Sequence, residues 1–246
     1  MVAVYLVDLS KVSEVLIPFL MEQLPLSEQL KLLRYRIEAD RLRGAVGKLL
    51  LQKVLREEGY GTDVLQKIQR DAYQRPFLDY TLDFNISHSG KWVVLAVGRQ
   101  LRLGIDVEEL RPIDLEAMTP FFTAEERGYI QSTIHPLATF YAIWTQKEAV
   151  LKANGKGLHL ALEQVQLSGA KALCEQQEWY LYSLDFHPQY ACHLALSDQC
   201  QILYSCFEIQ LLSTQLQWIP SFEPLTNVQI NHSTLPILEN NFHSTQ

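Results

Sequence analysis

Three carboxylates and a lysine recur in two short segments of this sequence at spacings that suit a phosphate site. In the segment 104–108, Gly-Ile-Asp-Val-Glu, the alternation of a strand places Asp106 and Glu108 on one face. In the segment 144–152, Trp-Thr-Gln-Lys-Glu-Ala-Val-Leu-Lys, helical spacing places Glu148 and Lys152 on one stripe. Magnesium prefers oxygen ligands and completes its shell with water and substrate phosphate. The segments therefore predict Mg²⁺ held by the three carboxylates beside a phosphate-binding amine.

Each of these features has an ordinary explanation when it is taken alone. Acids are common at the solvated end of a strand, so Asp106 and Glu108 by themselves are weak evidence for a site. Glu148 and Lys152 stand four residues apart, and such a pair contributes only about 0.3 kcal/mol on an exposed helix. The Gly-Lys-Gly segment at 155–157 follows directly and adds flexible backbone with an amine. That addition suits a phosphate better than a packing contact.

A pattern of strands and helices must position these side chains. Apolar or alternating runs predict strands, and apolar residues at three- and four-residue spacing predict helices. We expect strands at 2–9, 84–88, 92–97, 103–106, 179–184, 190–196 and 201–207. We expect three helices: one at 30–58, one that begins after a capping box at Thr123, and one at 137–153. Glycines 59 and 61 should end the first helix, and glycine 155 should end the third. Each half thus holds a helix on a small, mainly antiparallel sheet, which indicates an α+β protein of two similar α/β lobes.

The expected division of the chain follows from these elements. The N-terminal lobe is predicted at 1–103, the C-terminal lobe at 104–219, and a polar extension at 220–246. The extension is rich in Asn, Gln, Ser and Thr. An extended wrap and a disordered tail fit that composition equally well.

Charge is distributed unevenly along the chain. The formal net charge is -7, and all 21 Lys and Arg residues lie at or before Lys171. An anionic ligand should therefore be held by the earlier part of the chain. The net acidity argues against nucleic acid as a partner.

Composition excludes several other classes of protein. With 246 residues of which 48% are hydrophobic, the chain can bury a substantial core. Its apolar runs fall short of a membrane span, and Asp8 interrupts the first run too early for a signal peptide. The four cysteines lack metal-ligand spacing, so we expect neither structural zinc nor disulfides, and a cytoplasmic location. A serine-hydrolase elbow, a P-loop and a dinucleotide fingerprint are all missing from the sequence.

Taken together and in order, the motifs resemble the Sfp-type 4'-phosphopantetheinyl transferases. The resemblance covers roughly residues 5 to 200 and rests on Gln-Arg-Pro at 74–76, Phe-Asn-Ile-Ser-His-Ser-Gly at 84–90, and the two segments above. It implies a fold of two lobes related by a pseudo-twofold axis, with the site in the cleft between them. It also implies transfer of the phosphopantetheine arm of coenzyme A to a serine of an apo acyl, polyketide or peptidyl carrier protein, with release of adenosine 3',5'-bisphosphate. Such enzymes serve fatty acid, polyketide and nonribosomal peptide biosynthesis, and two internal lobes make a monomer sufficient.

The resemblance also implies roles for individual residues. Asp106, Glu108 and Glu148 would hold Mg²⁺ against the pyrophosphate, and Glu148 would accept the proton of the carrier serine, directly or through a water. Lys152 would neutralise the departing phosphate oxygen. The remaining residues implied to bind coenzyme A are Ser87 and His88 at the pyrophosphate, and Arg43, Arg75 and Pro76 at the 3'-phosphate and adenine end.

Two points depart from or extend the family pattern. The usual Gly-Lys-Pro is Gln-Arg-Pro here, which keeps the positive charge of Arg75 and changes the geometry it offers to a 3'-phosphate. The carrier protein is expected to dock between Arg111 and Arg127, where Phe121 and Phe122 offer apolar contact.

Two other functions remain open at this point. A metal-dependent pyrophosphatase or phosphodiesterase would hydrolyse coenzyme A without any carrier. A non-catalytic module that binds coenzyme A or a carrier would be indifferent to replacement of Glu148.

Overall fold

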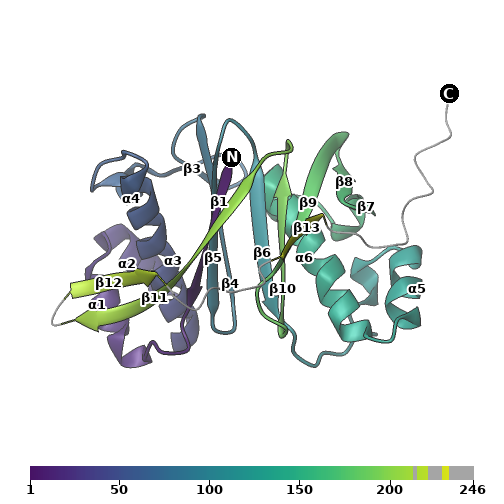
Figure 1. Cartoon of the computed structure of the whole chain (residues 1–246), viewed down its shortest axis with the longest axis horizontal. Coiled ribbons are helices and arrows are strands. Elements are labelled where there is room, and N and C mark those ends of the chain that lie inside the picture. The colour runs from purple at the N-terminus through teal and green to yellow at the C-terminus, as the bar shows by residue number, and fades with distance from the viewer. Residues whose placement is uncertain (213–214, 221–228, 233–246) are drawn as a thin grey trace.

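The chain folds into two lobes, each built from a sheet and a long helix (Figure 1). The computed structural model describes residues 1–212, 215–220 and 229–232. The first sheet has the order β12 (Gln215–Pro220), β11 (Ile202–Leu212), β1 (Val2–Asp8), β5 (Trp92–Arg99), β4 (Leu82–Ser89). The second has the order β6 (Leu103–Glu109), β10 (Tyr190–Leu196), β9 (Gln177–Asp185), β8 (Lys171–Cys174), β7 (Gln166–Ser168), and β13 (Gln229–His232) also pairs with β9.

Helices and short elements complete the lobes. The α-helices are α1 (Ile17–Glu22), α2 (Leu26–Leu32), α3 (Glu38–Glu57), α4 (Val64–Lys67), α5 (Ala124–Ser132) and α6 (Pro136–Asn154). A small hairpin of β2 (Gln69–Arg70) and β3 (Pro76–Phe77) precedes β4. Single turns of 3-10 helix are η1 (Glu14–Leu16), η2 (Thr119–Phe121), η3 (Gly157–His159) and η4 (Leu162–Gln164).

The layers follow from the alternation of apolar residues along the strands. Val2, Val4 and Leu6 of β1 share one buried cluster with Ile105 and Val107 of β6, so the two sheets pack face to face. The outer face of the first sheet is covered by α3, and that of the second by α6 (Figure 1). The predicted two-lobed α+β fold is confirmed.

Local signals set the helix ends near the site. The hydroxyl of Thr123 accepts from the backbone N–H of Glu126, and the carboxylate of Glu126 accepts from the N–H of Thr123, which completes the predicted capping box of α5. Gly155 ends α6 with φ +92°, in the left-handed region that glycine adopts without strain. The predicted stop of α6 is therefore confirmed.

The single helix predicted at 30–58 is wrong, because α2 and α3 are separate. A turn at 33–37 divides them. A Cβ on Gly44 would approach Leu32 Cδ2 to 2.5 Å, so the missing side chain lets α2 pack closely on α3. Leu32 and Leu42 belong to the same buried cluster. Both helices bury an apolar face, and the spacing of those residues therefore does not reveal the break.

The chain returns to the first lobe after β10. Strand β11 runs parallel to β1, with Val4 opposite Tyr204, and the other strand pairs within the described residues are antiparallel. The predicted boundaries at 103 and 219 stay predictions. Most of the predicted extension at 220–246 lies outside the described residues, with Pro220 and β13 as the exceptions.

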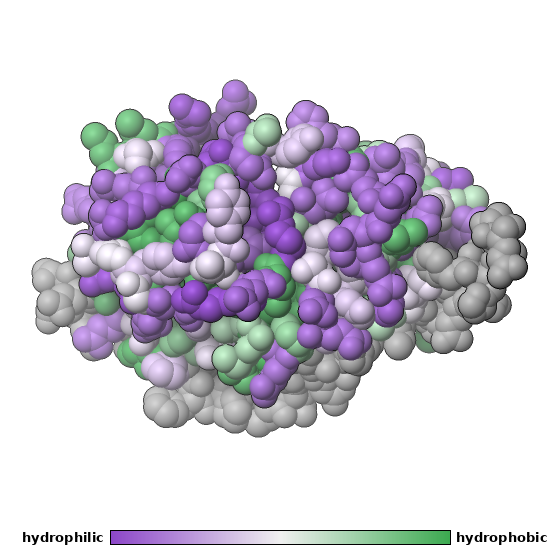
Figure 2. Space-filling view, turned by 90° about the horizontal axis from the view of Figure 1, so that it is seen from above, coloured by the Kyte–Doolittle hydropathy of each residue, from purple (hydrophilic) through white to green (hydrophobic). Residues whose placement is uncertain are grey.

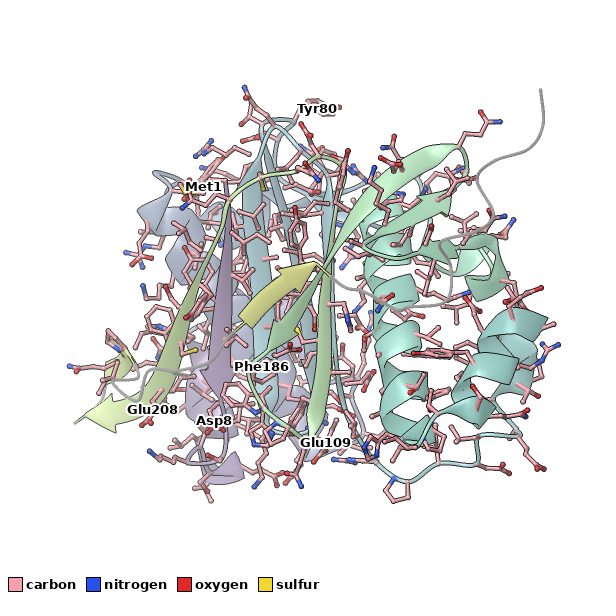
Figure 3. All side chains as sticks on the ribbon, turned by 45° about the vertical axis from the view of Figure 1, so that its right-hand side comes forward. Met1, Asp8, Tyr80, Glu109, Phe186 and Glu208 are labelled. Carbon is pink, nitrogen blue, oxygen red and sulfur yellow. The ribbon has the colours of Figure 1, made fainter. Side chains whose placement is uncertain are left out.

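The ends of the strands define two ends of the molecule. Met1 and Tyr80 lie at one end, and Asp8 and Glu109 lie at the other (Figure 3). On the face seen from above, hydrophilic residues predominate and hydrophobic residues form small separate patches (Figure 2). Within the described ranges, no helix is both long enough and apolar enough to cross a bilayer.

Candidate active site

The two lobes meet along β4 and β6, a contact that we name the seam. Strand β6 is an edge of its sheet, and an edge normally leaves backbone N–H groups unpaired. Here side chains of β4 accept from those groups. The pairs are Leu103 N to Asp83 Oδ2 at 2.9 Å, Ile105 N to Asn85 Oδ1 at 2.9 Å, Val107 N to Ser87 Oγ at 3.4 Å, and Glu109 N to Ser89 Oγ at 3.1 Å. The seam thus extends the hydrogen bonding of β6 across the lobes.

Alternation along β4 produces these contacts. The odd positions 83, 85, 87 and 89 are polar and face β6, while Phe84 and Ile86 pack toward α3. Each acceptor stands 20 residues before its donor. The polar side chains at every second residue of β4 therefore accept the hydrogen bonds of β6 that the backbone of a neighbouring strand would otherwise accept.

Helix α6 approaches the other side of β6 very closely. A Cβ on Gly104 would collide with the backbone of Ala149 and Ala153 in α6. Only glycine at this position allows the helix to lie against the strand at this distance. The close approach places the stripe that carries Glu148 and Lys152 beside the acidic face of β6.

A cavity of about 380 Å³ lies where β4, β6 and α6 meet. Its lining residues are Ile86, Ser87, His88, Asp106, Glu108, Trp144, Glu148 and Lys152. The fold therefore brings together the three predicted metal ligands, the predicted phosphate lysine, and the serine and histidine of the β4 motif. These groups come from both lobes.

Asp106 is the most buried acid of the cavity, with 3% of its surface exposed. Its Oδ1 accepts from Ser87 Oγ at 2.9 Å and from Lys152 Nζ at 2.5 Å. Its Oδ2 is buried and has no hydrogen-bond partner among the described residues. A buried carboxylate oxygen without a donor is costly, and a cation would satisfy it.

The other two carboxylates are also unfavourable as anions. Burial raises the pKa of Glu148, and the charge of Asp106 adds to that rise. Burial raises the pKa of Glu108 too, against the hydrogen bond that Ser89 Oγ donates to it at 2.7 Å. Neighbouring half-buried acids of this kind are stabilised by a positive charge placed among them.

A divalent cation fits this donor set, although the acids do not yet form a complete ligand cluster. Among the described residues, no group of three or more His, Cys, Asp and Glu side chains stands ready to hold a metal ion. Lys152 occupies one oxygen of Asp106 and leaves the other free. The oxygen-only chemistry of Asp106, Glu108 and Glu148 matches the preference of magnesium.

Lys152 stands at the centre of the seam. Its Nζ donates to Ser87 Oγ at 3.0 Å and to the Ile105 carbonyl at 3.3 Å, besides its ion pair with Asp106. Its side chain is 27% exposed, so the amine remains open toward the cavity. A lysine in this position can pair with a ligand phosphate.

His88 lines the cavity, whereas Arg43 of α3 is not among the lining residues. Burial lowers the pKa of His88, and the nearby charge of Arg43 lowers it further. Arg43 Nη1 donates to the Gly90 carbonyl at 2.7 Å and Nη2 pairs with Asp40 at 2.5 Å, whereas its buried Nε has no partner among the described residues. A neutral imidazole and an open guanidinium N–H are both donors that suit an anion.

Arg75 and Pro76 do not line the cavity. Arg75 is 6% exposed, and its guanidinium forms a two-pronged ion pair with Asp83, at 2.6 and 2.8 Å. Pro76 begins β3 and is half-buried. The predicted contact of these two residues with a 3'-phosphate stays a prediction.

A buried ion pair lies beside Glu148, and no motif in the sequence predicts it. Lys147 is fully buried and pairs with Glu126 at 2.7 Å, which also caps α5. Burial lowers the pKa of Lys147, and Glu126 opposes that change. The pair joins α5 to α6 one residue before Glu148. The capping-box motif was the only signal for Glu126, and it pointed to a helix start.

Glu126→Gln should destabilise the protein by about 3–5 kcal/mol, because it leaves Lys147 buried without its ion-pair partner. Urea unfolding measures the change. Glu125→Gln is the matched control, since Glu125 is exposed on the same helix and should shift the midpoint little. Equal midpoints for the two variants would show that the pair does not stabilise α5 against α6.

Ser89→Ala should weaken binding of Mn²⁺ at the cavity by about 10-fold to 100-fold, because the Ser89 hydroxyl orients Glu108. Ser89→Thr keeps the hydroxyl and should recover much of the loss. Ser132→Ala, at the exposed end of α5, is the control. An unchanged Mn²⁺ affinity in Ser89→Ala would contradict the orienting role.

Two family models match this chain. A family model described as the 4'-phosphopantetheinyl transferase superfamily matches residues 102–199. A second, described as the N-terminal part of 4'-phosphopantetheinyl transferases, matches residues 13–100.

Curated relatives carry the same description. A putative 4'-phosphopantetheinyl transferase of Haemophilus influenzae is 34% identical over 185 residues, which cover 70% of this chain and 74% of the relative. The transferase gsp of Aneurinibacillus migulanus is 32% identical over 58% of this chain and 61% of its own length. The transferase Sfp of Bacillus subtilis is 34% identical over 53% of this chain and 59% of its own length. The match thus spans about three fifths of the last two relatives.

Proposed function

This chain belongs to the 4'-phosphopantetheinyl transferase superfamily, and from that membership we propose that it modifies apo carrier proteins with the 4'-phosphopantetheine arm of coenzyme A. The acceptor is a serine of an acyl, polyketide or peptidyl carrier protein, and the second product is adenosine 3',5'-bisphosphate. The cavity at the seam supports the proposal most directly, because it joins the buried carboxylate of Asp106 and the half-buried carboxylates of Glu108 and Glu148 to a lysine and a histidine.

The proposal includes Mg²⁺ held by Asp106, Glu108 and Glu148. The free, buried Oδ2 of Asp106 and the raised pKa values of Glu108 and Glu148, which burial causes, support this assignment. A bound Mg²⁺ would supply positive charge to the pyrophosphate oxygens.

The chain's own residues handle the proton and the leaving group. The serine oxygen forms a bond to the phosphorus on the pantetheine side of the pyrophosphate, and the bond from that phosphorus to the bridging oxygen breaks. The serine proton goes to Glu148, directly or through a water, and its raised pKa improves it as a base. Lys152 neutralises the negative charge on the oxygen that leaves with adenosine 3',5'-bisphosphate.

Coenzyme A is oriented by donors on the first lobe. Ser87 and His88 face the cavity from β4, and Arg43 keeps an open Nε beside His88. Hydrogen bonds from Ser87 and His88 would fix the pyrophosphate before the serine arrives, and Arg43 would bind the 3'-phosphate end. Positioning of this kind carries much of the catalysis in phosphoryl transfer.

The carrier protein is proposed to dock beside the cavity, between Arg111 and Arg127. Phe121 is 42% exposed and lies edge-on to Trp144, with the ring centroids 5.9 Å apart, whereas Phe122 is buried. Phe121 is therefore the aromatic residue of the pair that a partner can contact.

We place the reaction in the cytoplasm and assign it to a monomer. The four cysteines, all within the described residues, are free thiols, and one chain supplies every residue that lines the cavity. Reduced thiols are typical of that compartment.

Incubation with coenzyme A, magnesium and a panel of apo carriers tests the function. The carriers should gain the mass of one phosphopantetheine arm. Hydrolysis of coenzyme A without a carrier would instead indicate a pyrophosphatase or phosphodiesterase. Binding of coenzyme A with neither reaction would indicate a non-catalytic module.

A further inference from the structure

We propose that Arg75 and Asp83 form a clasp between the lobes that positions Lys152, and that Arg75 acts through this clasp instead of binding a coenzyme A phosphate. The clasp is defined as the Arg75–Asp83 ion pair together with the backbone groups that it holds. The inference rests on the proposed function for the role of Lys152, whereas the contacts of the clasp stand independently of it.

The guanidinium of Arg75 bonds three different parts of the molecule. Nη1 and Nη2 donate to the carboxylate of Asp83 at 2.6 and 2.8 Å. Nη2 also donates to the Leu103 carbonyl, at 2.8 Å, and Nε donates to the Lys152 carbonyl, at 3.1 Å. Arg75 thus links β4 of the first lobe to β6 and α6 of the second.

These contacts leave little of Arg75 for a ligand. A guanidinium has five N–H donors, and the four hydrogen bonds occupy four of them. Arg75 and Asp83 are 6% and 8% exposed, so the charge is neutralised in a buried pair. A phosphate would have to break that pair, and uncoupling a buried ion pair is costly.

Asp83 has a second function at the same place. Its Oδ2 accepts from the N–H of Leu103 at 2.9 Å, which makes it the first of the four acceptors along the seam. Asp83 therefore accepts a hydrogen bond from the N–H of Leu103, and Arg75 donates one to its C=O. Residue 103 is fixed against β4 at the point where β6 begins.

The clasp also completes the end of α6. The last carbonyls of a helix have no partner within the helix and carry its negative dipole end. Arg75 satisfies the carbonyl of Lys152, and Arg102 donates to the carbonyls of Ala153 and Asn154 at 3.3 and 3.2 Å. Two cations thus stabilise the turn that carries Lys152.

Gly155 makes this approach possible. Its φ of +92° is strained for any other residue, and a Cβ there would come within 2.6 Å of Arg75 Cδ and 2.7 Å of Arg102 Nη2. The glycine therefore ends the helix and also leaves room for both arginines.

Both ends of Lys152 are consequently held at the seam. Its carbonyl accepts a hydrogen bond from Arg75, and its Nζ donates to Asp106, Ser87 and the Ile105 carbonyl. Ile105 lies two residues after Leu103 on β6. A shift of the α6 end relative to β6 would move the amine away from the cavity. Displacements of about 1 Å at a reacting group reduce rates by about 10²-fold.

Arg75→Lys and Asp83→Asn test the proposal, with Arg70→Lys as the matched control on the same hairpin. Arg70 is exposed and donates only to the Gln74 carbonyl among the contacts seen. The clasp predicts a fall in kcat of about 10²-fold with a KM for coenzyme A within about 3-fold of the unchanged protein. The control should keep both constants.

Binding of coenzyme A and of 3'-dephospho-coenzyme A, measured by calorimetry, separates the two roles of Arg75. The clasp predicts that Arg75→Lys keeps the ratio of the two affinities. If Arg75 instead binds the 3'-phosphate, the ratio of the two affinities should fall toward one in Arg75→Lys. That result would overturn the proposal. Neither measurement requires transfer, so a failure of the clasp is distinguishable from a failure of the proposed function.

Hydrogen exchange supplies a test that does not depend on any ligand. Arg75→Lys and Asp83→Asn should both speed amide exchange at 151–156, and Arg70→Lys should not. If Arg75→Lys does not fold, Asp83→Asn provides the same comparison, because asparagine has nearly the same shape as aspartate. Unchanged exchange at the end of α6 in a folded clasp variant would contradict the proposal.

Discussion

Glu148→Gln should reduce the transfer rate by about 10²-fold to 10⁴-fold while coenzyme A binding changes by less than about 3-fold. The amide keeps the shape of the side chain and removes both the proposed proton acceptor and one proposed metal ligand. Single-turnover rates and calorimetry with coenzyme A measure the two effects separately. A binding module would lose nothing in the first measurement, because it has no turnover to lose.

The same variant should be more stable than the unchanged protein near neutral pH. Burial, followed by the charge of Asp106, raises the pKa of Glu148, so the ionised form destabilises the fold. Removing that charge should raise the thermal midpoint of unfolding. This gain in stability should vanish as the pH falls below 4.5, the ordinary pKa of a Glu carboxyl, because the carboxyl is then protonated in both the folded and the unfolded protein. Glu22→Gln, at an exposed position of α1, is the control. Full activity without added stability would contradict both roles of Glu148.

Asp106→Ala should abolish transfer and the response to magnesium together. The substitution removes the buried carboxylate whose Oδ2 is free, and it leaves Lys152 without its ion pair. Loss of a magnesium ligand and loss of the lysine's partner both reduce the rate, so we expect a fall of at least about 10³-fold. Binding of Mn²⁺, followed by its paramagnetic signal, reports the metal site without any turnover.

Asp106→Asn separates the two consequences. Asparagine keeps a hydrogen-bond acceptor for Lys152 and Ser87 but removes the charge that favours a divalent cation. We expect weak Mn²⁺ binding in both variants and a smaller loss of stability in Asp106→Asn. Tight Mn²⁺ binding in Asp106→Ala would refute the assignment of Asp106 as a ligand.

The acidic face of β6 and the stripe on α6 could be read from the sequence, because each depends on a local period. Asp106 and Glu108 are two residues apart in a strand, and Glu148 and Lys152 are four apart in a helix. The contact between the acidic face and the stripe is a tertiary contact, and Gly104 permits it because it lets α6 lie against the strand. The resemblance to the transferase family predicts that these two segments meet.

The seam could not be read from the sequence in this way. Ser89 and Asn85 look like ordinary turn and strand residues, and only the pairing of β4 with the edge of β6 gives them a function. Arg75 in a turn predicted a solvated or phosphate-binding cation. Its burial against Asp83 depends on the end of α6, which lies about 80 positions later in the chain.

Two elements of the fold were hidden for related reasons. The break between α2 and α3 leaves the apolar spacing intact, since both helices bury one face. The return of β11 to the first sheet is a long-range parallel pairing with β1, and its apolar pattern fits either lobe. Periodicity identifies an element and its buried face, but it does not identify the neighbour.

The mass of an apo carrier protein after incubation with this protein, coenzyme A and magnesium is the most direct test of the central claim. The account predicts that one carrier serine gains one phosphopantetheine arm, that adenosine 3',5'-bisphosphate accumulates in equal amount, and that Glu148→Gln prevents both. A panel of acyl, polyketide and peptidyl carriers that all keep their original mass would contradict it.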